Sequence, residues 1–556
     1  MVDDGDRPGA ADPTGEGAAL GRRAFLAGVV AAALAAACGG DDGGDGGGDG
    51  GAARTPGTEP PASLPPVPDG LPDELFALGV ASGDPVADSV ILWTRLVADP
   101  LAPDGGLPDA PVPVHWQVAT DEGFDDVVAE GDAVADPALA HAVHVDPGGL
   151  DPDTRYWYRF AVGDRTGPVG RTRTAPADDA APDRLRFAFA SCQNRQDGYW
   201  GALAHLADED VDLVVFLGDY IYEDAPNPGA VRTGETPEPV DLAGYRARYG
   251  EYKRDPLLQA AHARVPWIAT WDDHEVQNNY AGDVGLVPPG QPPEAFRARR
   301  AAAYQAYYEH MPLRVDPPDP AAAADGGALT LHRQVGWGEL ARFFVLDGRQ
   351  HRSDQACDAP LDVGTCPEVE DEARTMLGEE QEAWLGEALG ASGATWNVVA
   401  QQVVLSRIPL PLGSPPSVAL DLWDGYPAAR RRLVDQLRPV RNPVVITGDI
   451  HASGVGVVTA DPDDRASPPA VPELVGTSIS SDFPPVLVDV VERAAADSPA
   501  IRYVNARQRG YVVCEVTPEA LTAEFRYVDT VTAAEARIAT GARWTVRDGD
   551  PEPVEA

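Results

Sequence analysis

Short apolar and alternating runs, separated by turn signals, dominate the chain between residues 74 and 176. Three clear examples lie at 89–94, 114–118 and 156–160. Regularly spaced short strands without a helical period are typical of a β-sandwich of the fibronectin or immunoglobulin type. We therefore predict a small β-sandwich domain over residues 73–177.

From about residue 185 the pattern changes to apolar, strand-like runs that alternate with helical stretches such as 242–262 and 378–389. This alternation predicts a layered α/β domain, in which helices cover buried strands. We place this domain at residues 183–540 and interpret residues 541–556 as an acidic C-terminal tail.

The N-terminal 38 residues have the pattern of an export signal. Arg22 and Arg23 precede an apolar stretch that ends at Cys38, which is typical of a twin-arginine signal read by the twin-arginine export machinery. The stretch is too short and too rich in alanine to serve as a stable membrane anchor. The alanines before Cys38 resemble a lipobox, which predicts lipidation there, and simple cleavage after a small residue is the alternative.

Residues 39–72 are rich in Gly and Asp and then in Pro, with little apolar surface to bury. Such a composition predicts a disordered tether. A tether behind a lipidated cysteine fits an exported protein that is either secreted or anchored to the cell surface as a lipoprotein. Cys357 and Cys366 flank a short loop, which suits a local disulfide in an oxidising compartment.

Charge and length restrict the choice of function. At 556 residues the chain is expected to form two domains with additional tails. Its formal net charge of −45 would repel the phosphates of nucleic acid, so we expect no nucleic-acid binding patch.

Polar clusters follow five of the strand-like runs in the α/β region. Ligands bind beyond the carboxyl ends of strands in open α/β sheets, so these clusters are expected to converge on one site. The candidate residues that they contribute are Cys192, Asp219, Tyr222, Asp273, His274, Arg349, Asp449 and His451.

The residue types in these clusters predict a metal site with two or three ions. Asp219 follows a glycine at a strand end and is the natural carboxylate bridge between two ions. A thiolate from Cys192 and a phenolate from Tyr222 favour Fe³⁺ over Zn²⁺, because a phenol needs a strong Lewis acid to ionise at neutral pH. An adjacent position rich in oxygen would suit Ca²⁺.

The ordered motifs of the chain resemble those of PhoD-type alkaline phosphatases, and the N-terminal segment 76–96 is similar to the β domain of that family. The motifs that carry this resemblance are Ser-Cys-Gln at 191–193, Gly-Asp-Tyr-Ile-Tyr-Glu at 218–223, 272–279, Asp-Gly-Tyr-Pro at 424–427 and Gly-Asp-Ile-His at 448–451. The Gly-Asp-x-x-Tyr element is also similar to purple acid phosphatases.

The resemblance implies a metallophosphoesterase-like layered α/β fold behind the β domain, with Fe³⁺ and Ca²⁺ as cofactors. It implies that Cys192, Asp219 and Tyr222 hold iron, that Asp219 bridges to calcium, and that Asp273 and Asp449 help to bind calcium. The allocation of Asp449 and His451 between the ions stays open.

The expected reaction is hydrolysis of phosphomonoesters, and also of diesters, by a metal-bound hydroxide. His274 is expected to stabilise the phosphoryl group or to protonate the leaving alkoxide, with orientation of Asp273 as the alternative. Asn278 and Asn279 are candidates to contact an ion or phosphate, and Arg349 to bind phosphate.

Three other functions compete with this interpretation. One is a phosphodiesterase or phospholipase D-like enzyme acting on lipid or cell-wall diesters. A second is a non-catalytic surface binding protein. A third, a serine hydrolase using Ser453, lacks a Gly-x-Ser-x-Gly elbow.

Overall fold

The computed structural model describes residues 64–285, 292–358, 363–408, 417–461, 464, 466–496 and 498–556. The predicted export signal over 1–38, the lipidation candidate Cys38 and residues 39–63 of the predicted tether lie outside these ranges. In the described part of the chain, no helix has both the length and the apolar character needed to cross a membrane.

The larger of two central sheets contains ten strands in the described residues, in the order β24-β23-β22-β21-β9-β10-β11-β1-β2-β5. Within this sheet the adjacent strands β9, β10 and β11 run parallel to one another, whereas the C-terminal strand β21 pairs antiparallel with β9. The strands are β1 (Val80–Val86), β2 (Ser89–Arg95), β5 (Ala142–Val145), β9 (Leu185–Ala190), β10 (Leu213–Phe216), β11 (Trp267–Ala269), β21 (Arg509–Val516), β22 (Ala520–Val528), β23 (Ile538–Arg547) and β24 (Asp550–Glu555).

A second central sheet contains seven strands in the described ranges, in the order β12-β13-β15-β17-β19-β18-β20, and β13, β15, β17 and β19 run parallel. The strands are β12 (Arg333–Trp337), β13 (Ala341–Val345), β15 (Trp396–Ala400), β17 (Pro443–Thr447), β18 (Ser453–Thr459), β19 (Pro469–Val475) and β20 (Ile501–Asn505). The short β14 (Val363–Gly364) and β16 (Val418–Ala419) pair with each other elsewhere.

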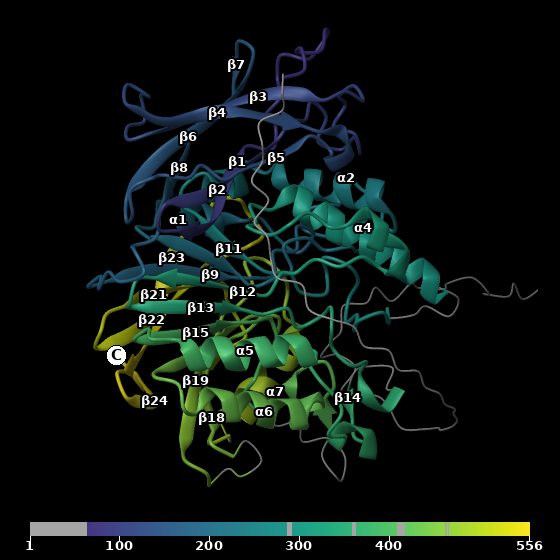
Figure 1. The fold of residues 1–556 in the computed structure, drawn as a ribbon. Coiled ribbons are helices and arrows are strands. Elements are labelled where there is room, and N and C mark those ends of the chain that lie inside the picture. The colour runs from purple at the N-terminus through teal and green to yellow at the C-terminus, as the bar shows by residue number, and fades with distance from the viewer. Residues whose placement is uncertain are drawn as a thin grey trace, which may run out of the picture.

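The two central sheets pack face to face, with helices on their outer faces (Figure 1). Successive residues of a strand point to opposite faces, so Phe343 enters the core between the sheets while Phe344 packs under the helices. The helices are α1 (Gly201–Asp208), α2 (Leu242–Lys253), α3 (Pro256–His262) and α4 (Pro293–His310) on the larger sheet, and α5 (Glu379–Ala391), α6 (Pro427–Leu437) and α7 (Pro485–Ala496) around the smaller one.

The N-terminal region differs from the separate domain that the sequence predicts. Strands β1, β2 and β5 continue the larger central sheet, because Gly83 pairs with Trp267 of β11. The other strands of the region form their own sheet at one end of the molecule (Figure 1). They are β3 (Val112–Ala119), β4 (Val127–Ala135), β6 (Arg155–Val162), β7 (Arg165–Thr166) and β8 (Gly170–Arg173). An apolar core joins both sets of strands and already includes Leu71, which the sequence interpretation assigns to the tether.

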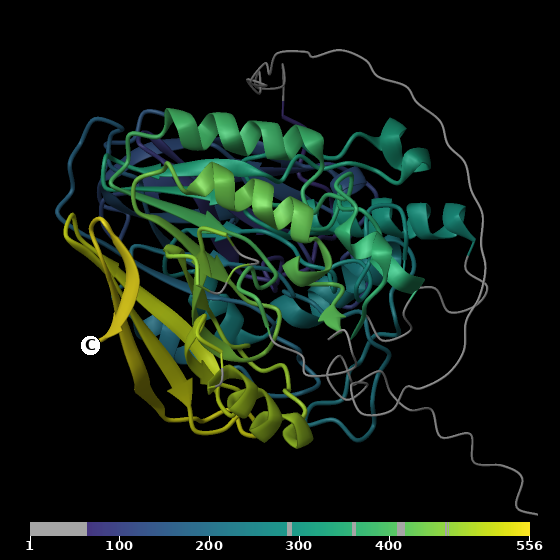
Figure 2. The same ribbon diagram turned by 90° about the horizontal axis from the view of Figure 1, so that it is seen from below.

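The prediction of an acidic tail over 541–556 is wrong. Strand β23 pairs along β22, and β24 pairs with β23, so the C-terminus lies at the edge of the larger sheet (Figure 2). Trp544 and Val546 are buried between the sheets. The charged residues around them point outward, because buried and exposed positions alternate along the strand. The prediction followed the acidic composition of the segment and overlooked this alternation.

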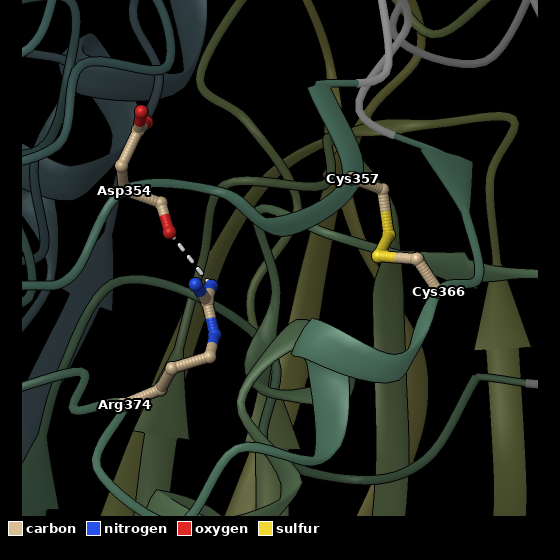
Figure 3. The surroundings of a disulfide bond; sticks show 4 residues. All are labelled: Asp354, Cys357, Cys366 and Arg374. Atoms are coloured by element: carbon tan, nitrogen blue, oxygen red, sulfur yellow. Dashed lines mark hydrogen bonds between the residues drawn. A yellow bond between two sulfur atoms is a disulfide. The ribbon is translucent and has the colours of Figure 1, made fainter. Parts of the chain in front are cut away.

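A disulfide joins Cys357 to Cys366, the two cysteines whose spacing suggested a local bridge (Figure 3). In the same segment the side chain of Arg374 donates a hydrogen bond of 2.7 Å to the backbone carbonyl of Asp354. These contacts hold together a segment that has little regular secondary structure.

Candidate metal centre

The candidate ligands lie at the carboxyl ends of parallel strands from both central sheets. Cys192 follows β9, Asp219 follows β10 and Asp273 follows β11, while Asp449 and His451 follow β17. A bridge between Ser191, after β9, and Ser478, after β19, holds these edges of the two sheets together. The sheets therefore present their ligand-bearing loops to one place.

Two glycines allow the loops to approach each other. A side chain at Gly218 would place its Cβ 2.5 Å from the Cβ of Asp272, and one at Gly448 would meet the Oγ of Ser191 at 2.2 Å. Neither position has room for a side chain, so each glycine in a Gly-Asp pair permits the ligand loop to pack closely.

Four of the candidate ligands have left-handed backbone conformations. The φ angles are 58° for Cys192, 57° for Asp219, 62° for Asp449 and 54° for His451. Non-glycine residues rarely adopt this region, and such conformations concentrate at functional sites, where the surrounding structure maintains them.

Among the residues that the structure describes, the donor atoms form three overlapping groups, and within each group they lie within 4.8 Å of one another. One group is Cys192, Asp219 and His451; a second is Asp219, Asp273 and His274; a third is Asp272, Asp273 and Asp449. Asp219 and Asp273 each belong to two groups, so their carboxylates are placed to be shared between neighbouring ions.

Unsatisfied oxygens show that these residues fit a cation. Oδ1 of Asp219 and Oδ1 of Asp273 are buried and have no hydrogen-bond partner. Burial raises the pKa of Asp219 and of Asp449 well above the usual range, and neighbouring aspartates add to both shifts. Bringing these carboxylates together carries a large electrostatic cost, which a bound cation would offset.

Tyr222 and His451 are oriented toward Asp219. The Tyr222 hydroxyl donates to Oδ2 of Asp219 at 2.7 Å, lies 3.1 Å from Nε2 of His451 and contacts the Ser481 hydroxyl at 2.8 Å. Nδ1 of His451 faces the backbone carbonyl of Asp482 at 2.8 Å, which places the ring proton on Nδ1. Nε2 of His451 is then left as an electron-pair donor toward the site.

Burial raises the pKa of the thiol and of the phenol, as it does for the carboxylates. It raises the pKa of Cys192 and of Tyr222 well above their usual values, with Asp219 adding to both shifts. Both groups would stay protonated in the protein alone. Ionisation at neutral pH therefore requires a nearby positive charge, as in a metal complex.

His274 is held by a carboxylate that sequence reasoning did not single out. Its Nδ1 lies 2.6 Å from Glu223, and its ring stacks on Tyr222 with the centroids 4.0 Å apart. Burial alone would lower the pKa of His274, but Glu223 and Asp219 raise it well above the usual value. Both carboxylates therefore favour the protonated form of this imidazole.

Arg349 lies entirely within a set of carboxylates. Its side chain is fully buried, and it contacts Asp272 at 2.5 Å, Asp421 at 2.8 Å and Asp273 at 3.6 Å. These carboxylates raise its pKa, and it in turn lowers the pKa of Asp273. The structure thus places Arg349 behind Asp273, where it keeps that carboxylate ionised.

The two asparagines contribute backbone groups to the site. The Asn278 amide donates to Glu223 at 2.8 Å, and the Asn279 amide donates to Asp273 at 2.6 Å. Asn279 has a φ of 52°, which turns the chain around the Asp273 carboxylate. Through these amides, the segment after β11 orients both acids.

Sequence reasoning missed several residues that complete the site. Asp272 belongs to a donor group, and the Glu275 carboxylate accepts from the amides of Asp219, Tyr220 and Asp272. Asp272 and Glu275 flank Asp273 and His274 in the sequence, so their position was a usable signal. For Asp421, distant in sequence, we find no local signal.

Two family models and several known proteins match the sequence and the fold of this chain. The family model described as "PhoD-like phosphatase" matches residues 187–525, and the one described as "PhoD-like phosphatase, N-terminal domain" matches residues 65–176. Alkaline phosphatase D of Bacillus subtilis (strain 168) is 46% identical over 480 residues, which cover 84% of this chain and 80% of that protein.

A solved structure described as "Structure of PhoD" is similar over 87% of this chain and 92% of that chain, with a TM-score of 0.81 and 44% identity. Purple acid phosphatase 23 of Arabidopsis thaliana is 25% identical over 155 residues, or 26% of this chain and 32% of that protein. Together with the fold, these likenesses define the protein as a phosphoric ester hydrolase. The chain belongs to the PhoD-like phosphatase family.

Proposed function

We propose that this protein is an exported, metal-dependent alkaline phosphatase that hydrolyses phosphomonoesters and also accepts phosphodiesters. The observation that carries the proposal is the convergence of sulfur, phenol, imidazole and carboxylate groups at the sheet edges. Within this cluster, Oδ1 of Asp219 and Oδ1 of Asp273 are buried without a hydrogen-bond partner. Buried charges in proteins are either paired with an opposite charge or coordinate a metal ion.

The donor groups support an iron position beside a calcium position. Cys192, Asp219, Tyr222 and His451 would hold Fe³⁺, since thiolate and phenolate suit a strong, redox-active Lewis acid. Asp273, Asp449 and Asp272 form an oxygen-only group that would hold Ca²⁺. Bound there, the ions would supply Lewis acidity that withdraws charge from the phosphoryl oxygens and lowers the pKa of water.

The chain's own residues would orient the ester and deliver a proton. Arg349 fixes Asp273, and Glu223 fixes the ring of His274 by its Nδ1. The protonated His274 would then donate from its other nitrogen to the oxygen of the leaving alkoxide. Asp219 lies between the donor groups and keeps the centre together.

The export proposal is supported from two sides. Arg22 and Arg23 before an apolar stretch resemble a twin-arginine signal, and the described part of the chain contains a disulfide, a bond that persists in oxidising compartments. A lipid on Cys38 would anchor the enzyme to the membrane surface, while simple cleavage there would release it.

Metal analysis tests the central claim. The purified protein is expected to contain iron and calcium and to absorb visible light through thiolate- or phenolate-to-iron charge transfer. Cys192→Ser and Tyr222→Phe are each expected to weaken or shift that band. Cys514→Ser alters a buried core cysteine that belongs to none of the donor groups, and it should leave the band unchanged. A colourless, fully active zinc enzyme would overturn the iron assignment and spare the phosphatase one.

Substrate comparison decides between the phosphatase and its alternative, a phosphodiesterase or phospholipase D-like enzyme. Rates on p-nitrophenyl phosphate and bis-p-nitrophenyl phosphate are measured under identical metal loading. The proposal requires turnover of the monoester. Turnover of the diester alone would favour the alternative.

A further inference from the structure

Asp421 is a buried acid that contacts the candidate metal centre through Arg349. Its Oδ1 accepts hydrogen bonds from Nη1 of Arg349 at 2.8 Å and from the side-chain amide of Gln355 at 2.7 Å. Arg349 in turn contacts Asp272 at 2.5 Å and Asp273 at 3.6 Å. Asp421 therefore fixes the guanidinium group that lies behind two candidate ligands.

Gln355 connects Asp421 with the loop that follows β11. Its Nε2 donates to the carboxylate of Asp421 at 2.7 Å and to the backbone carbonyl of Asn279 at 2.9 Å. The backbone amide of Asn279 donates to Asp273 at 2.6 Å. One side-chain amide thus holds both the acid that fixes Arg349 and the turn around the Asp273 carboxylate.

The Cys357–Cys366 disulfide closes a short loop next to these residues (Figure 3). Gln355 lies two residues before the first of the two cysteines. Strand β14, which lies between the cysteines, pairs antiparallel with β16, and Asp421 lies two residues after β16. The loop is therefore linked to both partners of the hydrogen bond between Gln355 and Asp421.

The other contacts that hold this loop are small. Among the described residues, its apolar cluster consists of the buried Ala356, Val369 and Leu420, with Val418 and the two cysteines packed against them. Strands β14 and β16 contribute two residues each, and an isolated pair of strands is only marginally stable in water. A disulfide restricts the unfolded chain and so stabilises the folded loop, which makes the order of this loop dependent on the bridge.

We propose that the Cys357–Cys366 disulfide and Gln355 position the carboxylates of the oxygen-only group, so that tight binding of its cation requires the bridge. Gln355 is a positioning residue, because it acts through Asp421 and Arg349 and not on the substrate. The inference rests on the proposed function, since it requires Ca²⁺ at the oxygen-only group. It implies that the enzyme reaches its full calcium affinity only in a compartment where disulfides persist.

Calorimetric titration of the iron-containing, calcium-stripped full chain with Ca²⁺ tests the inference. Salt at about 0.15 M screens the acids on the surface, and the binding event that Asp449→Asn removes is assigned to the centre. Gln355→Ala is expected to raise the Kd of this event about tenfold or more, as the loss of a group that orients metal ligands does. Saturating Ca²⁺ should then restore kcat to near the wild-type value.

Gln436→Ala is the matched control. Gln436 is partly buried, as Gln355 is, and its side-chain amide donates to the backbone carbonyl of Glu382 at 3.1 Å. This variant should keep the wild-type Kd for Ca²⁺. A Kd within twofold of wild type in Gln355→Ala, or an equal rise in both variants, overturns the role of Gln355.

The double variant Cys357→Ser/Cys366→Ser removes the bridge without a reductant. Its Kd for Ca²⁺ should also rise about tenfold or more, whereas the iron charge-transfer band should stay unchanged, because Cys192 and Tyr222 are intact. If this variant does not fold, wild-type protein whose bridge is opened by a phosphine after folding takes its place, with the same band as the check on iron. An unchanged Kd without the bridge overturns the role of the disulfide.

The outcome also separates this inference from the proposed function. If wild-type protein shows no saturable calcium binding that depends on Asp449, the calcium assignment fails and this inference fails with it. If wild type binds Ca²⁺ and both Gln355→Ala and the bridge-free protein bind it equally tightly, only this inference fails.

Discussion

Asp84 and Asp219 make a matched comparison between two regions of the molecule. Each follows a glycine, Gly83 or Gly218, and each has a left-handed backbone, with φ of 45° and 57°. Both side chains are buried, at 2% and 1% exposure. By sequence and local conformation, the two Gly-Asp pairs are nearly equivalent.

Their partners make the two aspartates different. The Asp84 carboxylate accepts hydrogen bonds from Nε and Nη2 of Arg333 at 3.0 and 2.7 Å and from the backbone amide of Arg314 at 2.8 Å. These bonds fix strand β1 to the α/β region. Asp219 has Tyr222 on one oxygen and no hydrogen-bond partner on the other. A buried carboxylate with satisfied oxygens stabilises the structure, whereas one left unsatisfied among other acids is available to a cation.

Asp219→Asn should produce the largest effect. Removing the shared carboxylate is expected to lower kcat/KM on p-nitrophenyl phosphate by about a thousandfold or more, as losses of central electrostatic groups do. Metal content should fall with it, while the stability of the metal-free protein holds or rises, because one of several crowded acids is gone. Activity within tenfold of wild type would contradict the role of Asp219.

Asp84→Asn should show the opposite pattern. Leaving Arg333 without its buried partner is expected to reduce the free energy of unfolding by about 3 kcal/mol. Denaturant unfolding measures this loss, and kcat per folded molecule should stay near the wild-type value. A large fall in kcat with unchanged stability would mean that the comparison between the two aspartates is wrong.

Glu223→Gln should have an intermediate effect on catalysis. Glu223 orients His274, and loss of such a supporting carboxylate typically costs about tenfold to a hundredfold. The loss should be larger for an alkyl phosphate than for p-nitrophenyl phosphate, because only the alkoxide needs a proton to leave.

Glu238→Gln is the matched control for this variant, since Glu238 is partly exposed and pairs with Arg299 at 3.1 Å. It should leave both rates unchanged. An equal loss on both substrates in Glu223→Gln would argue for a purely structural role of that residue.

The smallest effect should be the pH dependence of stability that Lys253 causes. The buried amino group of Lys253 lies over the ring of Trp93 at 4.2 Å and donates to the Tyr220 hydroxyl at 3.2 Å. Burial lowers its pKa to about 7. Between pH 7 and the unfolded pKa of about 10.4, the unfolded chain binds one more proton, so stability rises with pH there.

The slope is expected to be about 1 kcal/mol per pH unit across this interval, and to vanish below the folded pKa. Lys253→Met should remove it. Unfolding midpoints at pH 7, 8 and 9 measure the difference between the two proteins, and parallel slopes would show that Lys253 does not titrate in this interval.

Local sequence was sufficient for the strands around the candidate site and for the residues at their ends. The switch from short alternating runs to longer buried runs correctly separated strands such as β3 and β6 from the parallel strands β9, β10 and β17. Side-chain period and strand ends are local properties, so they can be read from a single chain. The same reasoning placed Cys192, Asp219 and Asp449 just after their strands.

Only the tertiary structure decided how these pieces share sheets and which acids are satisfied. It joined β1, β2 and β5 to the larger sheet, added β23 and β24 where a tail was expected, and surrounded Arg349 with carboxylates. It also gave Asp84 and Asp219 different hydrogen-bond partners. Strand pairing and hydrogen-bond satisfaction depend on residues that are distant along the chain, such as Arg333 for Asp84, and no local pattern of residue types contains that information.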